Sequence, residues 1–252
     1  MDRWYGKLAI VTGASSGIGA AVAEALVKEG MEVVGLARRV DKMECLAKRL
    51  SHHPGKLYPR RADVTKEGDI VENFNWAISS HGPVHILINN AGVARPTDII
   101  GGDTQDFKRV LETNLLAFVI AAREACQSMI DNGVDGHIIN INSIVGHYVP
   151  IIPLINVYPA AKHGVTALTE TLRQELFRQG KKIKVTSVSP GYVKTEILTA
   201  NGFMKEEDVV SIEAASPYLN STDVADAVLY VLGTPENVQV TELTIRPVGE
   251  AV

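Results

Sequence analysis

The sequence predicts an α/β protein built on one doubly wound, seven-stranded parallel sheet with helices on both faces. Short β-branched apolar runs alternate with amphipathic stretches along the chain, a glycine-rich turn follows the first run, and polar residues recur just after several later runs. Right-handed crossovers place the ligand crevice of such a sheet at the carboxyl ends of its strands, where the strand order reverses. No linker, repeat or low-complexity tract divides the 252 residues, so we expect one domain over residues 1–252.

The elements follow from hydrophobic periodicity. Strands are expected at Leu8–Thr12, Glu32–Ala37, Lys56–Arg61, His85–Asn89, Gly136–Ile141, Ile183–Ser189 and Gln239–Ile245. Helices are expected at Ile18–Glu29, Asp41–Ser51, Thr65–Ser80, Thr104–Asn132, Asn156–Gln179 and Thr222–Leu232. The segment Glu196–Asn220 has weak periodicity, and we expect a substrate lid around residues 193–220.

The turn between the first strand and the first helix has the composition of a phosphate-binding site. Its glycines let the chain turn sharply, let the backbone approach a pyrophosphate and let helix pack against strand. The N-terminus of the following helix adds unpaired N–H groups and a partial positive charge. The candidate cofactor-binding residues of this turn are Gly13, Ser15, Ser16, Gly17, Ile18 and Gly19.

The end of the second strand indicates which dinucleotide binds. An acidic residue at this place accepts a hydrogen bond from a free ribose 2′-hydroxyl, whereas arginine accommodates a 2′-phosphate. Here the strand runs into Arg38 and Arg39 with no carboxylate at its tip. Guanidinium groups match phosphate in geometry and charge, so the sequence favours NADP(H).

Tyr158 and Lys162 form a candidate proton-transfer pair. They lie four residues apart at the start of a predicted helix, so both side chains leave one face of it. Asn156 is the expected cap of this helix, and Pro159 is tolerated in its first turn. A lysine about 5 Å from a phenol favours the phenolate by about 3 kcal/mol, which lowers the tyrosine pKa by roughly two units. Such a pair suits proton exchange with an alcohol oxygen.

Further polar residues follow the later strands. Asn90, Ala91 and Gly92 come after the fourth strand, Ser143 after the fifth, and Pro190-Gly191 after the sixth. Because the carboxyl ends of parallel strands meet at one edge of the sheet, we expect all of them at the crevice.

With these motifs the chain resembles the short-chain dehydrogenase/reductase family over essentially its whole length, which implies a Rossmann-type fold. The resemblance implies that Tyr158 is the general acid/base, that Lys162 lowers its pKa and holds the nicotinamide ribose, and that Ser143 orients the substrate oxygen. Asn114 is implied to keep a water that links Lys162 to solvent. The positions implied to bind the rest of the cofactor are Asp63 and Val64 at the adenine, Asn90 over the cofactor, and Val193 and Thr195 at the carboxamide and phosphates.

Within that family, the long apolar stretch before Tyr158 and the ending Val240–Pro247 resemble the subfamily of insect NADP-dependent farnesol dehydrogenases and a vertebrate ketosteroid reductase. Apolar residues expected around the substrate are Ile144, Val149, Ile151, Ile152, Leu154, Tyr192, Ile197, Leu198 and Phe203. They favour a small apolar alcohol or carbonyl, such as a farnesol-like terpenoid alcohol. A steroid ketone, a 3-hydroxy acid of the serine type, and a non-catalytic NADPH-binding sensor remain alternatives.

Composition and charge exclude several other classes. A net charge of −4 is not typical of proteins that bind nucleic acid, and no apolar run is long enough to insert into a membrane. Cys45 and Cys126 match no metal or redox spacing, so no metal site is expected. The beginning of the chain lacks the apolar core of a signal peptide, and we expect a cytoplasmic protein. The resemblance implies a homo-oligomer, a tetramer or a dimer, formed through the two long helices.

Overall fold

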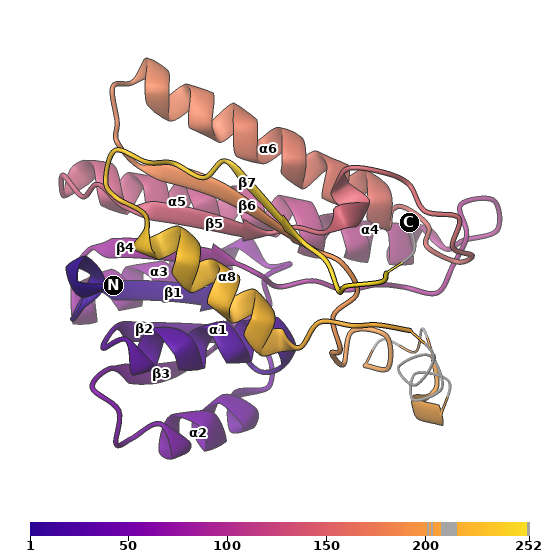
Figure 1. The fold of residues 1–252 in the computed structure, drawn as a ribbon, viewed down its shortest axis with the longest axis horizontal. Coiled ribbons are helices and arrows are strands. Elements are labelled where there is room, and N and C mark those ends of the chain that lie inside the picture. Colours follow the sequence, from indigo (N-terminus) through magenta and orange to yellow (C-terminus); the bar gives the residue numbers. More distant parts are fainter. Residues whose placement is uncertain (201, 203, 208–215, 251–252) are drawn as a thin grey trace.

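The computed structural model describes residues 1–200, 202, 204–207 and 216–250. These residues contain one seven-stranded sheet in the order β3-β2-β1-β4-β5-β6-β7, and every neighbouring pair is parallel (Figure 1). The fold class and all seven expected strands are therefore confirmed. The strands are β1 (Leu8–Thr12), β2 (Glu32–Ala37), β3 (Lys56–Arg61), β4 (Val84–Asn89), β5 (His137–Ile141), β6 (Lys184–Pro190) and β7 (Glu242–Ile245).

The burial of each strand follows its place in the sheet. The central strands β1 and β5 are buried along their whole length, as expected for parallel strands covered on both faces. The edge strand β3 leaves Lys56 and Arg61 exposed, and the other edge strand, β7, is only partly covered. β7 begins at Glu242 rather than at the expected Gln239, because its register with β6 starts at Ser187.

Helices cover both faces of the sheet. The main helices are α1 (Gly17–Lys28), α2 (Val40–Arg49), α3 (Glu67–His81), α4 (Thr104–Leu111), α5 (Ala117–Asp131), α6 (Tyr158–Arg178) and α8 (Ser221–Gly233). Helices α1, α2 and α8 pack with one face of the sheet around a core that includes Leu26, Met43 and Val228. On the other face, α3, α5 and α6 pack around Phe74, Met129 and Leu176.

The crevice lies where the order of the strands reverses. β1 pairs with β2 on one side and with β4 on the other, so successive crossovers leave β1 in opposite directions. Helix α1, which follows β1, packs on one face of the sheet and α5, which follows β4 in the chain, packs on the other, so the crevice forms at the carboxyl edge where these connections part.

Two helix predictions needed correction. The stretch 104–132 is not one α-helix, because a π-helical turn at Glu112–Leu116 separates α4 from α5. Helix α6 begins at Tyr158, and Asn156 is not its cap. Asn156 instead has a φ of 43°, donates from Nδ2 to the Arg95 carbonyl at 2.6 Å and accepts from the Val157 N–H. The contact with the neighbouring loop thus holds the residue in a left-handed conformation.

The two ends of the expected lid are tied together. Val193 and Leu219 form an isolated parallel bridge, with Leu219 N donating to Tyr192 O at 2.8 Å and Lys194 N donating to Leu219 O at 2.9 Å. Residues 201, 203 and 208–215 of this lid lie outside the described residues, including the expected substrate contact Phe203. Among the helices described, none has the length and apolar character needed to cross a bilayer.

Candidate active site

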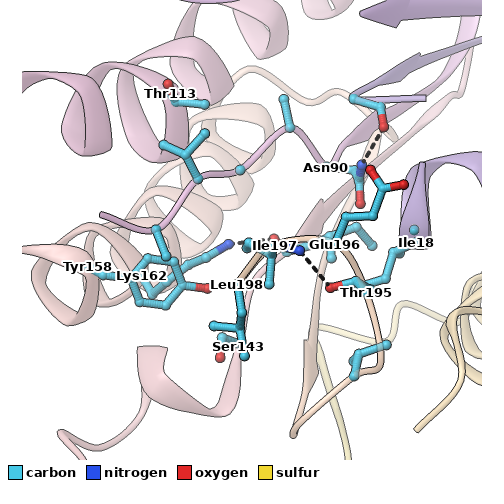
Figure 2. Close-up of a pocket in the computed structure, with 18 of the residues that line it drawn as sticks. Ile18, Asn90, Thr113, Ser143, Tyr158, Lys162, Thr195, Glu196, Ile197 and Leu198 are labelled. Atoms are coloured by element: carbon cyan, nitrogen blue, oxygen red, sulfur yellow. Dashed lines mark hydrogen bonds between the residues drawn. The ribbon is translucent and has the colours of Figure 1, made fainter. Parts of the chain in front are cut away.

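One cavity of about 1080 Å³ occupies the crevice at the carboxyl edge of the sheet (Figure 2). Of the predicted catalytic and cofactor-binding residues, only Gly19 and Asn114 do not line it. Those that line it are Gly13, Ser15, Ser16, Gly17, Ile18, Arg38, Arg39, Asp63, Val64, Asn90, Ala91, Gly92, Ser143, Tyr158, Lys162, Pro190, Gly191, Val193 and Thr195. The structure thus brings together residues from the ends of six strands.

The glycine turn has the backbone shape that only glycine adopts without strain. Gly13 and Gly17 have φ values of 70° and 55°, in the left-handed region. A Cβ at Gly19 would lie 2.4 Å from both the Gly13 carbonyl oxygen and Asn90 Nδ2, so its hydrogen lets α1 pack closely on the turn. Gly19 therefore acts behind the cavity wall, which explains why it does not line the cavity.

A hydroxyl at the end of β1 joins the two loops of the crevice. Thr12 Oγ1 accepts from the N–H groups of Asn90 at 2.9 Å and Ala91 at 3.1 Å. Asn90 Nδ2 returns a hydrogen bond to the Thr12 carbonyl at 2.9 Å. These bonds fix the loop after β4 against the glycine turn, so both sides of the cavity keep their spacing.

The carboxyl end of β2 supplies positive charge to the cavity. Arg38 and Arg39 line the cavity, and Arg39 Nη2 donates to Ser16 Oγ of the glycine turn at 2.7 Å. Asp63 follows β3; burial opposes its ionisation, but hydrogen bonds from Thr65 and the nearby Arg109 and Arg38 lower its pKa. The Asp63 carboxylate is therefore ionised at neutral pH, and it accepts from Thr65 Oγ1 at 2.8 Å.

Lys162 is almost wholly buried, and its side chain lines the cavity and reaches the end of β5. Its Nζ donates to the Ile141 carbonyl at 2.9 Å and lies 5.9 Å from the centroid of the Tyr158 ring. Burial lowers the pKa of the ammonium to about 8, because the charged form loses hydration. The lysine is thus close to the phenol but bonded to the backbone.

Tyr158 has the opposite pKa shift from the one expected. Burial raises the pKa of the phenol to about 12, although a hydrogen bond with the Ser143 side chain acts to lower it. The loss of hydration therefore outweighs the hydrogen bond with Ser143. In the protein alone, Tyr158 is therefore a protonated group at neutral pH.

Asn114 is held in place by the π-helical turn. Its Oδ1 accepts from Val93 N and its Nδ2 donates to Val93 O, both at 2.8 Å. The wider turn Glu112–Leu116 displaces this side chain toward the loop after β4, where both bonds become possible. Asn114 is fully buried behind the cavity, and its neighbour Thr113 lines it instead.

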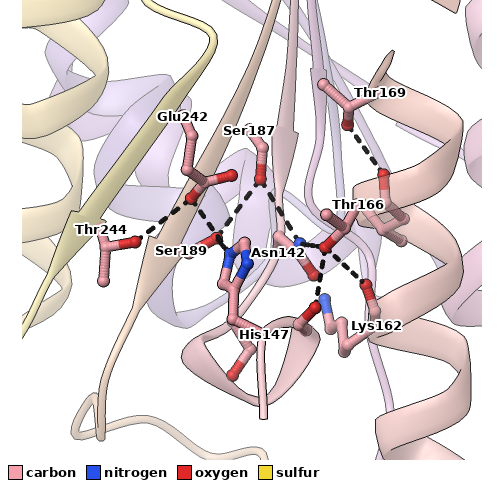
Figure 3. Close-up of polar contacts among 12 residues, drawn as sticks. Asn142, His147, Lys162, Thr166, Thr169, Ser187, Ser189, Glu242 and Thr244 are labelled. Atoms are coloured by element: carbon pink, nitrogen blue, oxygen red, sulfur yellow. Dashed lines mark hydrogen bonds and ion pairs between the residues drawn. The ribbon is translucent and has the colours of Figure 1, made fainter. Parts of the chain in front are cut away.

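A polar network joins Asn142, His147 and the backbone of Lys162 (Figure 3). Asn142 Nδ2 donates to Thr166 Oγ1 at 2.9 Å, and Thr166 donates to the Gly146 carbonyl at 3.0 Å. His147 does not line the cavity; its Nε2 lies 3.0 Å from Ser189 Oγ and 3.3 Å from Glu242 Oε1. The turn that follows Ser143 is thereby fixed to α6, β6 and β7 at once.

The end of the cavity near Tyr158 is apolar. Its lining includes Ile144, Tyr148, Val149, Ile151, Ile152, Ile155, Tyr192, Ile197 and Leu198. Leu154 was expected here but does not line the cavity, because its left-handed backbone directs it toward solvent, where it is 45% exposed.

The sequence interpretation missed two carboxylates in the cavity wall, Glu196 and Glu250. Glu250 accepts from the Tyr192 N–H at 2.8 Å and from Arg246 Nε at 2.7 Å. Glu196 could have been found from the sequence, because it directly follows the predicted cofactor contact Thr195. Glu250 could not, because its contact with Tyr192 joins residues far apart in the sequence. Among the described residues, no group of His, Cys, Asp or Glu is arranged to hold a metal ion.

Known proteins with similar sequences cover nearly the whole chain. The family model described as short chain dehydrogenase matches residues 7–205. A farnesol dehydrogenase of Aedes aegypti is 53% identical over 253 residues, covering 99% of both chains. The dehydrogenase/reductase SDR family member 11 of Mus musculus is 48% identical over 255 residues, covering 98% of this chain and 96% of that one.

Solved structures share the fold over the same extent. A serine dehydrogenase in its closed form, complexed with NADP+, has a TM-score of 0.88 and 26% identity, covering 97% of this chain and 96% of that one. An alcohol dehydrogenase of the archaeon Thermococcus sibiricus, complexed with 5-hydroxy-NADP, has a TM-score of 0.84 and 26% identity over 98% of both chains.

Proposed function

The chain belongs to the short-chain dehydrogenase family, and we propose that it is an NADP(H)-dependent oxidoreductase that interconverts an apolar alcohol and its carbonyl. A farnesol-like terpenoid alcohol is the favoured substrate. The observation that carries the proposal is the convergence of Tyr158, Ser143 and Lys162 at the apolar end of a cavity whose other end holds the glycine turn and Arg39.

The residues present fit a dinucleotide with a 2′-phosphate. The glycine turn and the N-terminus of α1 are assigned to the pyrophosphate, and Arg38 and Arg39 to the 2′-phosphate. Arg39 already binds an anionic group of this chain, the Glu196 carboxylate, at 2.8 Å, so this place accepts negative charge. Two of the similar solved structures hold NADP+ or 5-hydroxy-NADP, which also supports NADP(H). The bound nicotinamide supplies or accepts the hydride.

The proton chemistry is assigned to Tyr158. A phenol with a pKa of about 12 is protonated at neutral pH and can donate its proton to the oxygen of a carbonyl substrate. In the opposite direction the phenol must first lose that proton, and the Lys162 ammonium supports the phenolate through its positive charge. Ser143 holds the substrate oxygen beside the phenol. Asn114 retains one amide hydrogen beyond its bond to Val93, and we assign that hydrogen to a water leading to Lys162.

The cavity favours a neutral, apolar substrate. Burial of a terpenoid chain against the isoleucines of this end contributes about 25 cal/mol per Å² of apolar surface. A hydroxy acid needs a cation for its carboxylate, but among the described lining residues Lys162 is the cation at this end. Arg38, Arg39 and Arg109 lie near Asp63 or Glu196 at the other.

A coupled panel tests this proposal. Farnesol, a steroid ketone and serine are each assayed with NADP(H) and NAD(H), with Tyr158→Phe as the matched variant. We expect farnesol with NADP+ to give the highest kcat/KM, and Tyr158→Phe to lose turnover while still binding NADPH by fluorescence. A higher kcat/KM for serine would overturn the substrate, a preference for NAD(H) would overturn the cofactor, and NADPH binding without turnover of any substrate would favour the sensor.

We also propose that the protein is a homo-oligomer, a dimer or a tetramer. Leu116 at the end of the π-helical turn, Val119 in α5 and Phe177 near the end of α6 are exposed apolar side chains in the region expected to form the contact. Sedimentation equilibrium at micromolar concentration tests it, and a monomer there would contradict it.

A further inference from the structure

The segment after β6 links the two ends of the cavity. Thr195 lies over the glycine turn, where its Cγ2 would be 3.1 Å from a Cβ at Gly17. Two residues later, Ile197 and Leu198 line the apolar end near Tyr158 and Ser143 (Figure 2). In the sequence, Glu196 lies between Thr195 at the glycine turn and Ile197 and Leu198 at the apolar end. A change in the contacts of the Glu196 side chain therefore affects the backbone at both ends of the cavity.

The Glu196 carboxylate is bound by two cations beside the end of β2. Its Oε2 accepts from Arg39 Nη1 and its Oε1 from Lys42 Nζ, each at 2.8 Å. The same guanidinium donates through Nη2 to Ser16 Oγ of the glycine turn at 2.7 Å. One carboxylate oxygen is thus engaged by Arg39, which lines the cavity where this fold reads the ribose 2′-position, and the other by Lys42 on α2.

We propose that Glu196 is an internal competitor of the cofactor's 2′-phosphate and determines how strongly the protein distinguishes NADP(H) from NAD(H). The inference rests on the proposed use of NADP(H). A 2′-phosphate that binds Arg39 and Lys42 must displace the carboxylate, which releases Thr195–Leu198 from the adenosine end. A cofactor without this phosphate has no group that replaces Glu196 on the two cations.

Exchange of one anion for the other is feasible on physical grounds. The side chains of Arg39, Lys42 and Glu196 are 42%, 41% and 45% exposed, and ion pairs this accessible to water are individually weak. A phosphate carries more charge than a carboxylate and offers three acceptor oxygens to the same donors. The ion pairs therefore hold the segment in the free protein without preventing cofactor from binding.

The test compares ligands that differ only in the 2′-phosphate. Calorimetry measures the Kd of 2′,5′-ADP and of 5′-ADP for the wild type, for Glu196→Gln and for the control Glu170→Gln. Glu170 is an exposed carboxylate bound to Arg173 at 2.6 Å on α6, outside the cavity. In Glu196→Gln we expect 2′,5′-ADP to bind about threefold to tenfold tighter, because two weak ion pairs no longer compete. The Kd of 5′-ADP and both Kd values of the control should stay within about twofold of wild type.

Hydrogen exchange of the amides of residues 194–200 gives a second measurement. In the wild type we expect 2′,5′-ADP to accelerate exchange of this segment and 5′-ADP to leave it unchanged. In Glu196→Gln the segment should exchange at the faster rate without ligand.

Two outcomes separate the competition from the proposed cofactor. If the wild type prefers 2′,5′-ADP but Glu196→Gln does not strengthen that preference, the competition is wrong and the cofactor proposal stands. If neither protein prefers 2′,5′-ADP over 5′-ADP, the assignment of NADP(H) is wrong, and the role of Glu196 is overturned with it.

Discussion

Lys162→Met removes the positive charge beside Tyr158 while keeping an unbranched side chain of similar length. The ammonium lies 5.9 Å from the centroid of the Tyr158 ring. At an effective dielectric constant near 20, a charge at that distance favours the phenolate by about 3 kcal/mol, or about two pKa units. Because burial already places the phenol pKa at about 12, the variant has still less phenolate at any pH. We expect kcat/KM for alcohol oxidation to fall about 100-fold near pH 7, where the wild-type ammonium is charged.

The same substitution should change the folding stability much less near neutral pH. Loss of the Lys162 bond leaves the buried Ile141 carbonyl without that donor, at a cost of about 1–3 kcal/mol. Against this, burial depresses the lysine pKa from 10.5 to about 8, so the folded state gains about 3 kcal/mol when that charge is removed. The two effects nearly offset each other. Above pH 8 the two effects no longer offset each other. Lys162 of the wild type loses its proton more readily in the folded than in the unfolded state, so the wild type gains stability between about pH 8 and pH 10.5.

Initial rates of alcohol oxidation with NADP+ between about pH 6 and pH 10 measure the catalytic effect, and thermal denaturation over the same range measures stability. Lys162→Arg is the control that keeps the charge. We expect the rise of kcat/KM with pH to move upward in Lys162→Met but not in the control. A folded Lys162→Met variant with a rate within about threefold of wild type and the same pH profile would refute the electrostatic role of this lysine.

Three further predictions concern tightly packed or buried residues, two of them beside the site. Gly19→Ala should cost about 1–3 kcal/mol of stability and weaken NADPH binding, since its Cβ would lie 2.4 Å from the Gly13 carbonyl oxygen. Gly68→Ala on α3, where a Cβ would meet no atom within 4 Å, should be neutral or stabilising when both variants are compared by thermal denaturation. Equal effects of the two would contradict the close-packing argument. His137→Gln should reduce the loss of folding stability in acid. Burial lowers the pKa of His137 to about 3, so below about pH 6.5 the histidine is protonated in the unfolded wild type but not in the folded one. This difference favours the unfolded state of the wild type in acid. Urea titrations at pH 7 and pH 4.5 measure this, and an equal loss in both proteins would refute it. Asn114→Ala should destabilise the fold by about 1–3 kcal/mol by leaving a buried N–H and C=O unpaired, and an unchanged melting temperature would show that the π-helical turn does not depend on this side chain.

The sheet could be predicted because its signals are local. A buried run such as Leu8–Thr12 is apolar at almost every position, and the glycine turn directly follows it. Once the alternation of strands and helices is known, the handedness of the crossovers brings the carboxyl ends together without further information. Tyr158 and Lys162 could be paired for the same reason, since helical geometry relates residues four apart.

The π-helical turn had no such signal, because the apolar spacing continues through Glu112–Leu116. The bonds between Asn114 and Val93 that accompany the turn join residues 21 positions apart. The cap assigned to Asn156 was wrong for a similar reason: its conformation is decided by the Arg95 carbonyl of another loop.

The sequence by itself determined the order of the strands and helices, the crevice they create and the residue types gathered there, because each depends on neighbours along the chain. Only the tertiary structure decided the sign of the Tyr158 pKa shift and the partner of Arg39. The first depends on how much water the folded chain removes from the phenol. The second depends on Glu196, which is 157 positions away from Arg39 in the sequence. Hydration and long-range ion pairs are properties of the packed molecule, and no pattern of neighbouring residues encodes them.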